Sequence, residues 1–129
     1  MAETKAPKQL IYPELSYQIM GLIFEVYNQL GPGFTEDIYE PALTVELEKH
    51  GIPYETQKCV DVFYKGQNLG VFRLDLVIDG KVILELKAVK ELNDLYRQQL
   101  LSYLKATGLR LGILINFGAE RVQTTRVAL

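Results

Sequence analysis

The sequence feature that most constrains the fold is the stretch Val71–Lys90, which reads as two β-strands joined by a tight turn. Apolar residues occupy the even-numbered positions of both strands: Leu74, Leu76, Ile78, Val82, Leu84 and Leu86. Side chains alternate between the two faces of a strand, so each apolar set covers one face. Asp75, Glu85 and Lys87 are then expected on the opposite face, which should be solvated or form a site.

The length of the turn decides whether the two strands bring these charged residues together. A two-residue loop at Asp79-Gly80 would place Asp75 on the face of Leu84, and one apolar set would point the wrong way. A three-residue loop with Gly80 in the left-handed conformation places both apolar sets on one face. The hydrophobic pattern therefore predicts the three-residue loop, with Asp75 on the same face as Glu85.

Composition sets the broad class of the protein. At 129 residues the chain is expected to be a single domain over residues 13–129, preceded by a flexible tail over residues 1–12. The net charge of −2 excludes a uniformly basic nucleic-acid module, so nucleic-acid binding would need a local basic patch. The single cysteine excludes an internal disulfide and a cysteine-based zinc site. No apolar run approaches the ~18 residues of a membrane span, and the N-terminus lacks the apolar core of a signal peptide. We therefore expect a cytoplasmic protein that does not enter the membrane.

Periodicity predicts the other elements of the chain. They are helices over 13–30 and 35–50, a half-buried strand over 59–64, the two strands described above, a helix over 94–107, a buried strand over 109–117, and a short final edge strand over 122–127. Pro41 either makes the first turn of the second helix irregular, with regular helix from Tyr39, or kinks that helix. This order predicts a mixed-sheet α/β fold flanked by helices, in which the third helix is a right-handed crossover between strands.

Three carboxylates are candidates for one metal site: Glu36 at the start of the second helix, Asp75 and Glu85. Magnesium takes oxygen ligands, commonly a few carboxylates together with substrate phosphate. Lys87 faces the same way as Glu85 and could steady an attacking water or the charge growing on a phosphate. These groups form a working set for metal-assisted phosphodiester hydrolysis. The competing interpretation is that Glu85 and Lys87 form a solvated ion pair of little energetic value.

The third helix offers candidate substrate contacts. Gln99 and Tyr103 lie four residues apart and share a face, so their amide and hydroxyl could hold a phosphate or a nucleotide. Arg97 on this helix and Lys90 just before it could contact backbone phosphates. The competing interpretations are a partly polar packing stripe for the first pair and solvated surface for the two cations.

Four motifs together resemble a known family. The segment Gly33–Tyr39 resembles the signature of the small bacterial GxxExxY proteins, which are placed in the PD-(D/E)XK nuclease superfamily. Asp75 followed by Glu85-Leu86-Lys87 resembles the D…ExK core of that superfamily. The segment Gln99–Tyr103 resembles the QxxxY helix motif of its exonuclease branch. The resemblance extends from about Ile11 to the C-terminus, and the ordered set is more specific for a family than for an activity.

The resemblance implies a nuclease core of helix, three strands, helix and strand. In that core Asp75, Glu85 and the backbone carbonyl of Leu86 would hold a divalent ion, Mg²⁺ or Mn²⁺. Glu36 would contribute from its helix, and Lys87 would orient the attacking water.

We therefore expect a divalent-metal-dependent nuclease that hydrolyses DNA phosphodiester bonds, and the choice of DNA rests on the resemblance alone. One alternative is a catalytically inactive nuclease fold that binds nucleic acid or a protein partner. A third reading is a metal-dependent hydrolase acting on small nucleotides. A homodimer is a further expectation, because one small acidic domain offers little basic surface for gripping a substrate.

Overall fold

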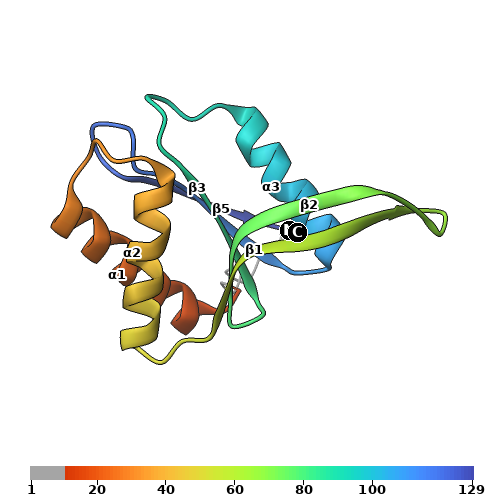
Figure 1. Ribbon diagram of the computed structural model, residues 1–129, viewed down its shortest axis with the longest axis horizontal. Coiled ribbons are helices and arrows are strands. Elements are labelled where there is room, and N and C mark those ends of the chain that lie inside the picture. Colours follow the sequence, from red (N-terminus) through yellow and green to blue (C-terminus); the bar gives the residue numbers. More distant parts are fainter. Residues whose placement is uncertain (1–10) are drawn as a thin grey trace, which may run out of the picture.

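The computed structural model describes residues 11–129 and forms a sheet flanked by helices (Figure 1). Its elements are α1 (Pro13–Leu30), α2 (Glu36–Lys49), β1 (Tyr54–Tyr64), β2 (Gln67–Ile78), β3 (Val82–Lys87), α3 (Asp94–Thr107), β4 (Leu111–Asn116) and β5 (Gln123–Ala128). The predicted mixed α/β class and element order are confirmed, including a last strand at the edge of the sheet. Most of the predicted tail, residues 1–10, lies outside the described residues, while Ile11 and Tyr12 pack against the core.

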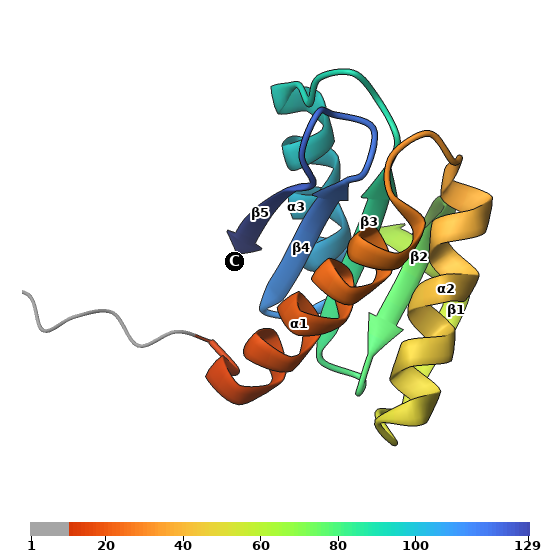
Figure 2. The ribbon, with the colours of Figure 1, turned by 90° about the vertical axis from the view of Figure 1, so that its left-hand side faces the viewer.

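The five strands lie in the sheet in the order in which they occur in the chain, β1-β2-β3-β4-β5. Neighbouring strands are antiparallel except β3 and β4, which run parallel and are connected through α3. The helices α1 and α2 cover one face of the sheet and α3 covers the other (Figures 1 and 2). Within residues 11–129 no helix is both long and apolar enough to cross a membrane.

The core is divided into two apolar clusters, one on each face of the sheet. The cluster beneath α1 and α2 includes Leu76 and Leu84, and the cluster beneath α3 includes Val77 and Ile83. The face opposite the even-numbered apolar set is therefore largely buried under α3. The expectation that this face would be solvated or form a site therefore fails at Val77 and Ile83, because a parallel connection must place its helix over one face.

The turn between β2 and β3 has the predicted length. Ile78 pairs with Val82, which leaves three loop residues, and Gly80 is left-handed with φ of 63°. Asp79 is also left-handed, with φ of 54°, and the N–H of Lys81 donates to the carbonyl of Ile78 at 2.9 Å. This register places Asp75 opposite Glu85, as the three-residue loop predicts.

The alternation of side chains along β2 is interrupted at Asp75. Leu74 packs in the α3 cluster, whereas Leu76 packs in the α1–α2 cluster. Residues two apart in a regular strand share a face, so the prediction that these two leucines lie together is wrong. Gln57, at the matching position of β1, has φ of 49° and no partner in the β1–β2 ladder. The alternation of side chains between the two faces is therefore interrupted in both strands, at Gln57 in β1 and at Asp75 in β2. This interruption turns Asp75 toward α2.

The second helix contains Pro41 without a break. It runs from Glu36 to Lys49, so the alternative in which regular helix begins near Tyr39 is wrong. The Tyr39 side chain is fully buried, its hydroxyl donates to the carbonyl of Gly31 at 2.6 Å, and its ring stacks on Phe117 at a centroid distance of 4.1 Å. The tyrosine thereby fixes the loop that leads into α2, and with it the position of Glu36.

Candidate functional site

Two carboxylates link β2 and β3 where the regular pairing of these strands ends. The carboxylate of Glu85 accepts a hydrogen bond from the N–H of Asp75 at 2.9 Å. The carboxylate of Asp75 accepts one from the N–H of Leu86, also at 2.9 Å. The backbone ladder stops at the pair formed by Leu76 and Leu84. We call Asp75 and Glu85, bonded in this way, the carboxylate clasp.

Burial makes ionisation of the clasp unfavourable. Only 5% of Glu85 is exposed, and desolvation, followed by the negative charge of Asp75, raises its pKa to about 8. Desolvation also raises the pKa of Asp75, against the opposing effects of the Leu86 N–H and the Lys87 ammonium. Two desolvated carboxyl groups side by side favour a proton or a cation between them.

Lys87 extends from the end of β3 toward α3. Its Nζ lies 4.7 Å from the centre of the Tyr96 ring, within the range of a cation–π interaction. The ammonium charge lowers the pKa of both carboxyl groups of the clasp, although burial outweighs this effect. Asp75, Glu85 and Lys87 therefore lie close together as predicted, but Asp75 borders the α2 side of the sheet and Lys87 the α3 side, so the prediction that they share one face is wrong.

A cavity of about 420 Å³ opens on the α2 side of Asp75. It is lined by Glu36, Asp37, Glu40, Pro41, Gln57 and Asp75. Glu36 thus borders the same cavity as Asp75, but Glu85 does not, and within residues 11–129 the three carboxylates do not form a cluster that could hold a metal ion.

Two further polar residues of this cavity are not apparent from the sequence. The Gln57 amide donates to the carboxylate of Glu40 at 2.6 Å and also to Asp75, whose pKa it lowers. Desolvation raises the pKa of Glu40, and the charge of Asp75 adds to this increase. Glu40 lies one helical turn after Glu36, which is a signal that could have identified it. Gln57 reaches the site only through its left-handed backbone, for which the sequence gives no signal.

The donor set fits a hard divalent cation. Over residues 11–129 no three His, Cys, Asp or Glu side chains come close enough together to hold a metal ion. The clasp offers two carboxylates beside a backbone carbonyl, and magnesium commonly binds one or two carboxylates and completes its shell with water and substrate phosphate. Binding of Mg²⁺ or Mn²⁺ by Glu36, Asp75, Glu85 and the Leu86 carbonyl stays a prediction.

The predicted substrate contacts of α3 differ in their surroundings. Tyr103 is buried and packs on Phe72 at a centroid distance of 4.8 Å. Burial, followed by the charges of Glu85 and Asp75, raises the pKa of Tyr103 to about 12. The Tyr103 hydroxyl therefore lies within electrostatic reach of the clasp.

The other three predicted contacts, Gln99, Arg97 and Lys90, are exposed. Gln99 precedes Tyr103 by one turn on the same face of α3. The roles of these three residues and of Tyr103 toward a substrate stay predictions.

Behind the clasp, Asn116 holds the chain that leaves β3. Its side chain is fully buried and bonds both the N–H and the carbonyl of Val89, at 3.0 and 2.9 Å. It also accepts from the N–H of Gly118 and donates to Gln123, each at 3.0 Å. All the strong bonding positions of this amide are therefore used in fixing the segment that follows Lys87.

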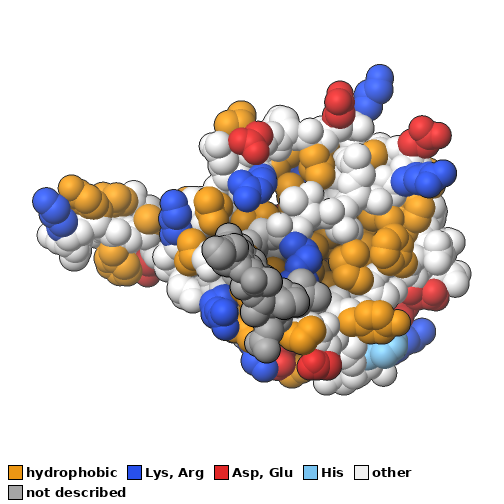
Figure 3. Space-filling model, turned by 180° about the vertical axis from the view of Figure 1, so that it is seen from behind, with side chains coloured by type: hydrophobic (Ala, Val, Ile, Leu, Met, Phe, Trp, Pro, Cys, Tyr) orange, Lys and Arg blue, Asp and Glu red, His pale blue; other side chains and the backbone are white. Residues whose placement is uncertain are grey.

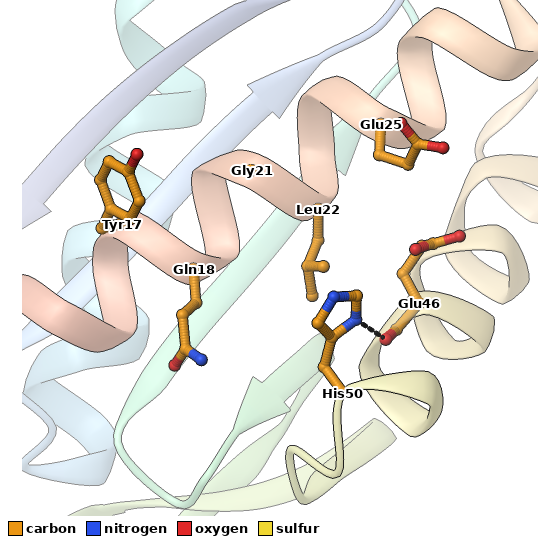
Figure 4. Close-up of a pocket in the computed structure, with 7 residues that line it drawn as sticks. All are labelled: Tyr17, Gln18, Gly21, Leu22, Glu25, Glu46 and His50. Carbon is orange, nitrogen blue, oxygen red and sulfur yellow. Dashed lines mark hydrogen bonds between the residues drawn. The ribbon is translucent and has the colours of Figure 1, made fainter.

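A second cavity, of about 460 Å³, lies between α1 and α2, away from the clasp (Figure 4). It is lined by Tyr17, Gln18, Gly21, Leu22, Glu25, Glu46 and His50. Nδ1 of His50 is hydrogen-bonded to the carbonyl of Glu46 at 2.9 Å, so the histidine is engaged with its own helix end. None of the predicted site residues borders this cavity.

Comparisons with known proteins place the fold. A family described as the PD-(D/E)XK nuclease superfamily matches this chain over residues 13–127. The crystal structure of SSO0001 is similar with a TM-score of 0.54 and 19% identity, over 90% of this chain and 58% of that one. The alkaline exonuclease LHK-Exo from Laribacter hongkongensis is similar with a TM-score of 0.54 and 11% identity, over 94% of this chain and 72% of that one. No curated protein matches. The chain thus spans somewhat over half the length of SSO0001, and at these identities the similarity shows the fold alone.

Proposed function

This chain belongs to the PD-(D/E)XK nuclease superfamily, and from that premise we propose that it is a divalent-metal-dependent nuclease that hydrolyses DNA phosphodiester bonds. The observation that supports this proposal is the carboxylate clasp of Asp75 and Glu85, with Lys87 beside it. Buried carboxylates with raised pKa values and a specific charge partner are typical of functional sites. The assignment to the GxxExxY branch and the choice of DNA over RNA belong to this proposal.

The clasp and the residues around it each have a defined role in the proposed reaction. Asp75, Glu85 and the carbonyl of Leu86 would hold Mg²⁺ or Mn²⁺, with Glu36 contributing from α2. An ion held there would offset the negative charge of the phosphate and would lower the pKa of the attacking water. Lys87 orients the attacking water and stabilises the charge that develops on the phosphate. Its contact with the Tyr96 ring keeps the ammonium near the site when no substrate is bound.

The proposal is tested by incubating purified protein with Mg²⁺ or Mn²⁺ and labelled single-stranded DNA, duplex DNA or RNA. We expect ion-dependent cleavage of DNA, and a loss of at least about 100-fold in the rate for Glu85→Ala, Asp75→Asn and Lys87→Ala, since removing one preorganised charge-stabilising group costs about 10²–10³. The matched control is Glu46→Ala, which removes a carboxylate from the second cavity and should leave the rate unchanged.

Circular dichroism and thermal melting check that each variant is folded. Cleavage of RNA but not DNA would correct the substrate, and cleavage of free nucleotides alone would favour the small-nucleotide hydrolase. Binding of nucleic acid without cleavage under both ions would overturn the catalytic proposal in favour of an inactive binding module. Undiminished cleavage by Glu85→Ala would refute the site.

A further inference from the structure

The outer parts of β1 and β2 form an arm that projects from the body of the protein. We define the arm as residues 58–73, the part of the β1–β2 hairpin between Gln57 and the buried Leu74. Figure 1 shows this ribbon extending well past the rest of the sheet. Only its inner residues Val60 and Phe72 pack against the α3 cluster. An isolated two-stranded hairpin gains little stability of its own, so a long arm suggests a binding role.

The arm exposes large apolar side chains. Phe63, Tyr64, Leu69 and Val71 are 62%, 59%, 65% and 59% exposed, respectively. A single exposed apolar residue needs no explanation, but several on one projecting ribbon indicate an interaction surface. Because the exposed surface of these side chains is mainly carbon, it would contact the bases or sugars of a nucleic acid, or another apolar surface.

The arm also differs in charge from the rest of the molecule. It contains three cations, Lys58, Lys65 and Arg73, and one carboxylate, Asp61, whereas the whole chain has a net charge of −2. Lys58 pairs with Glu55 at 2.9 Å, while Lys65 and Arg73 form no ion pair within residues 11–129. Seen from behind, the arm shows mainly orange and blue side chains (Figure 3). A basic and aromatic ribbon on an acidic protein is complementary to a polyanion.

One face of the arm is continuous with the clasp. Leu74 faces α3, so Arg73 points to the opposite side of β2, the side on which Asp75 borders the α2 cavity. Asp75 borders the α2 cavity, and Arg73 is exposed directly beyond it. Val71, two residues further out, continues the same face. A strand bound at the clasp can therefore extend along the arm without crossing the sheet.

We propose, on the premise of the nuclease function above, that this face of the arm and its tip bind an unpaired stretch of the nucleic-acid substrate next to the cleaved phosphate. On this face Arg73 contacts a phosphate and Phe63 stacks on a base. At the tip, where the Lys65 ammonium lies 5.4 Å from the centre of the Tyr64 ring, Lys65 contacts the next phosphate and Tyr64 stacks on the next base. Unpaired bases are favoured over a duplex because the base faces in a duplex are already stacked on one another, whereas those of a single strand are free to stack on aromatic rings. A second copy of the chain is disfavoured as the binding partner of the arm, because two arms in contact would bring like net charges together.

The proposal is tested by fluorescence anisotropy with labelled oligo-dT and a blunt duplex of the same length, using the Glu85→Ala protein so that no cleavage occurs. We expect tighter binding of the single strand. Phe63→Ala and Tyr64→Ala should each weaken it at least about fivefold, because stacking contributes about 1–3 kcal/mol per base. Arg73→Ala should lower the slope of log affinity against log salt by about 0.7. The matched control is Lys49→Ala, which removes an exposed cation at the end of α2 remote from Glu36 and should change affinity little.

The outcomes separate this proposal from the nuclease assignment. Undiminished single-strand binding by the arm variants, with cleavage intact in the unmodified protein, would refute the arm and leave the nuclease. Single-strand binding that depends on the arm, without any cleavage by the unmodified protein, would refute the nuclease and leave the arm. Preference for the duplex would overturn the arm proposal, as would a dimer in light scattering that Phe63→Ala and Val71→Ala dissociate. Thermal melting of each variant ensures that a loss of binding is not a loss of folding.

Discussion

At the scale of single residues, the burial of Glu85 couples the stability of the fold to pH. Its carboxyl has an ordinary pKa of 4.5, which applies to the unfolded chain, and a pKa of about 8 in the folded protein. Between these values the folded protein keeps a proton that the unfolded chain releases. The contribution of Glu85 to stability is therefore fully present below pH 4.5 and is lost as the pH rises through 8. The raised pKa of Asp75 acts in the same direction.

We predict that Glu85→Gln makes the stability of the fold depend less on pH. Glutamine is neutral at every pH, and its oxygen can still accept a hydrogen bond from the N–H of Asp75. Free energies of unfolding from urea titrations should show that the unmodified protein is less stable at pH 9 than at pH 5. The variant should be more stable at pH 9 by at least about 1 kcal/mol, since each pKa unit corresponds to about 1.4 kcal/mol. Mg²⁺ should stabilise the unmodified protein more at pH 9 than at pH 6, because binding competes with protonation. Equal pH slopes for the two proteins would contradict a buried, titrating Glu85.

The sequence predicts the meeting of Asp75, Glu85 and Lys87 because strand alternation and turn length are local properties. It does not predict Gln57 as a neighbour, because that contact depends on a left-handed residue facing an unpaired level of the ladder. The same interruption of the alternation explains why Leu74 lies on the face opposite to the one predicted. Strict alternation fails at the one level where the carboxylates replace backbone pairing, and departures from local rules of this kind concentrate at functional sites.

At the scale of elements, the segment between β3 and α3 depends on an unusually close backbone contact. A Cβ atom added at Gly118 would overlap the backbone of Ala88 and Val89, which Asn116 holds in place. We predict that Gly118→Ala destabilises the protein by about 1–3 kcal/mol, the range for overpacking of a well-packed interior. The measurement is chemical denaturation, with Gly21→Ala as control.

Gly21 lies within α1, and a Cβ there would meet no atom within 4 Å, so this control should be neutral or slightly stabilising. Equal stability of the two variants would show that the loop after β3 can move away. The rate of cleavage should fall with Gly118→Ala even at temperatures where the variant stays folded, because this segment follows Lys87 directly.

Element boundaries follow from the sequence where periodicity or a cap marks them. Asn93 caps α3, with its side chain accepting from the N–H of Leu95 at 2.9 Å. The strands β1 and β2 extend further than the sequence indicates, beginning at Tyr54 and Gln67. Their extra residues are mostly polar and exposed, so they lack the alternation that identifies a strand.

At the scale of the whole molecule, the arm can be separated from the fold that carries it. Asp61 and Val71 pair directly across the two strands. Replacing residues 62–70 by Asn-Gly would therefore close the hairpin with a favourable two-residue turn. We predict a melting temperature within about 5 °C of the unmodified protein, a shift that corresponds to about 1 kcal/mol, because neither cluster includes residues 62–70. Failure of this shortened protein to fold would show that the arm supports the core. Binding of oligo-dT should weaken at least as much as it does in Phe63→Ala, because the deletion removes both Phe63 and Tyr64.

The strands lie in the sheet in the order in which they are synthesised, and this order governs how the protein can fold as it is made. Each strand finds its partner in the segment made just before it, except that β4 must wait for α3 to cross over. The apolar side of α1, however, belongs to a cluster that also contains residues that emerge late, among them Ile113 and Phe117. A nascent chain that has not yet completed β4 therefore leaves the apolar cluster beneath α1 and α2 incomplete, and this interval is when chaperones would be expected to engage it.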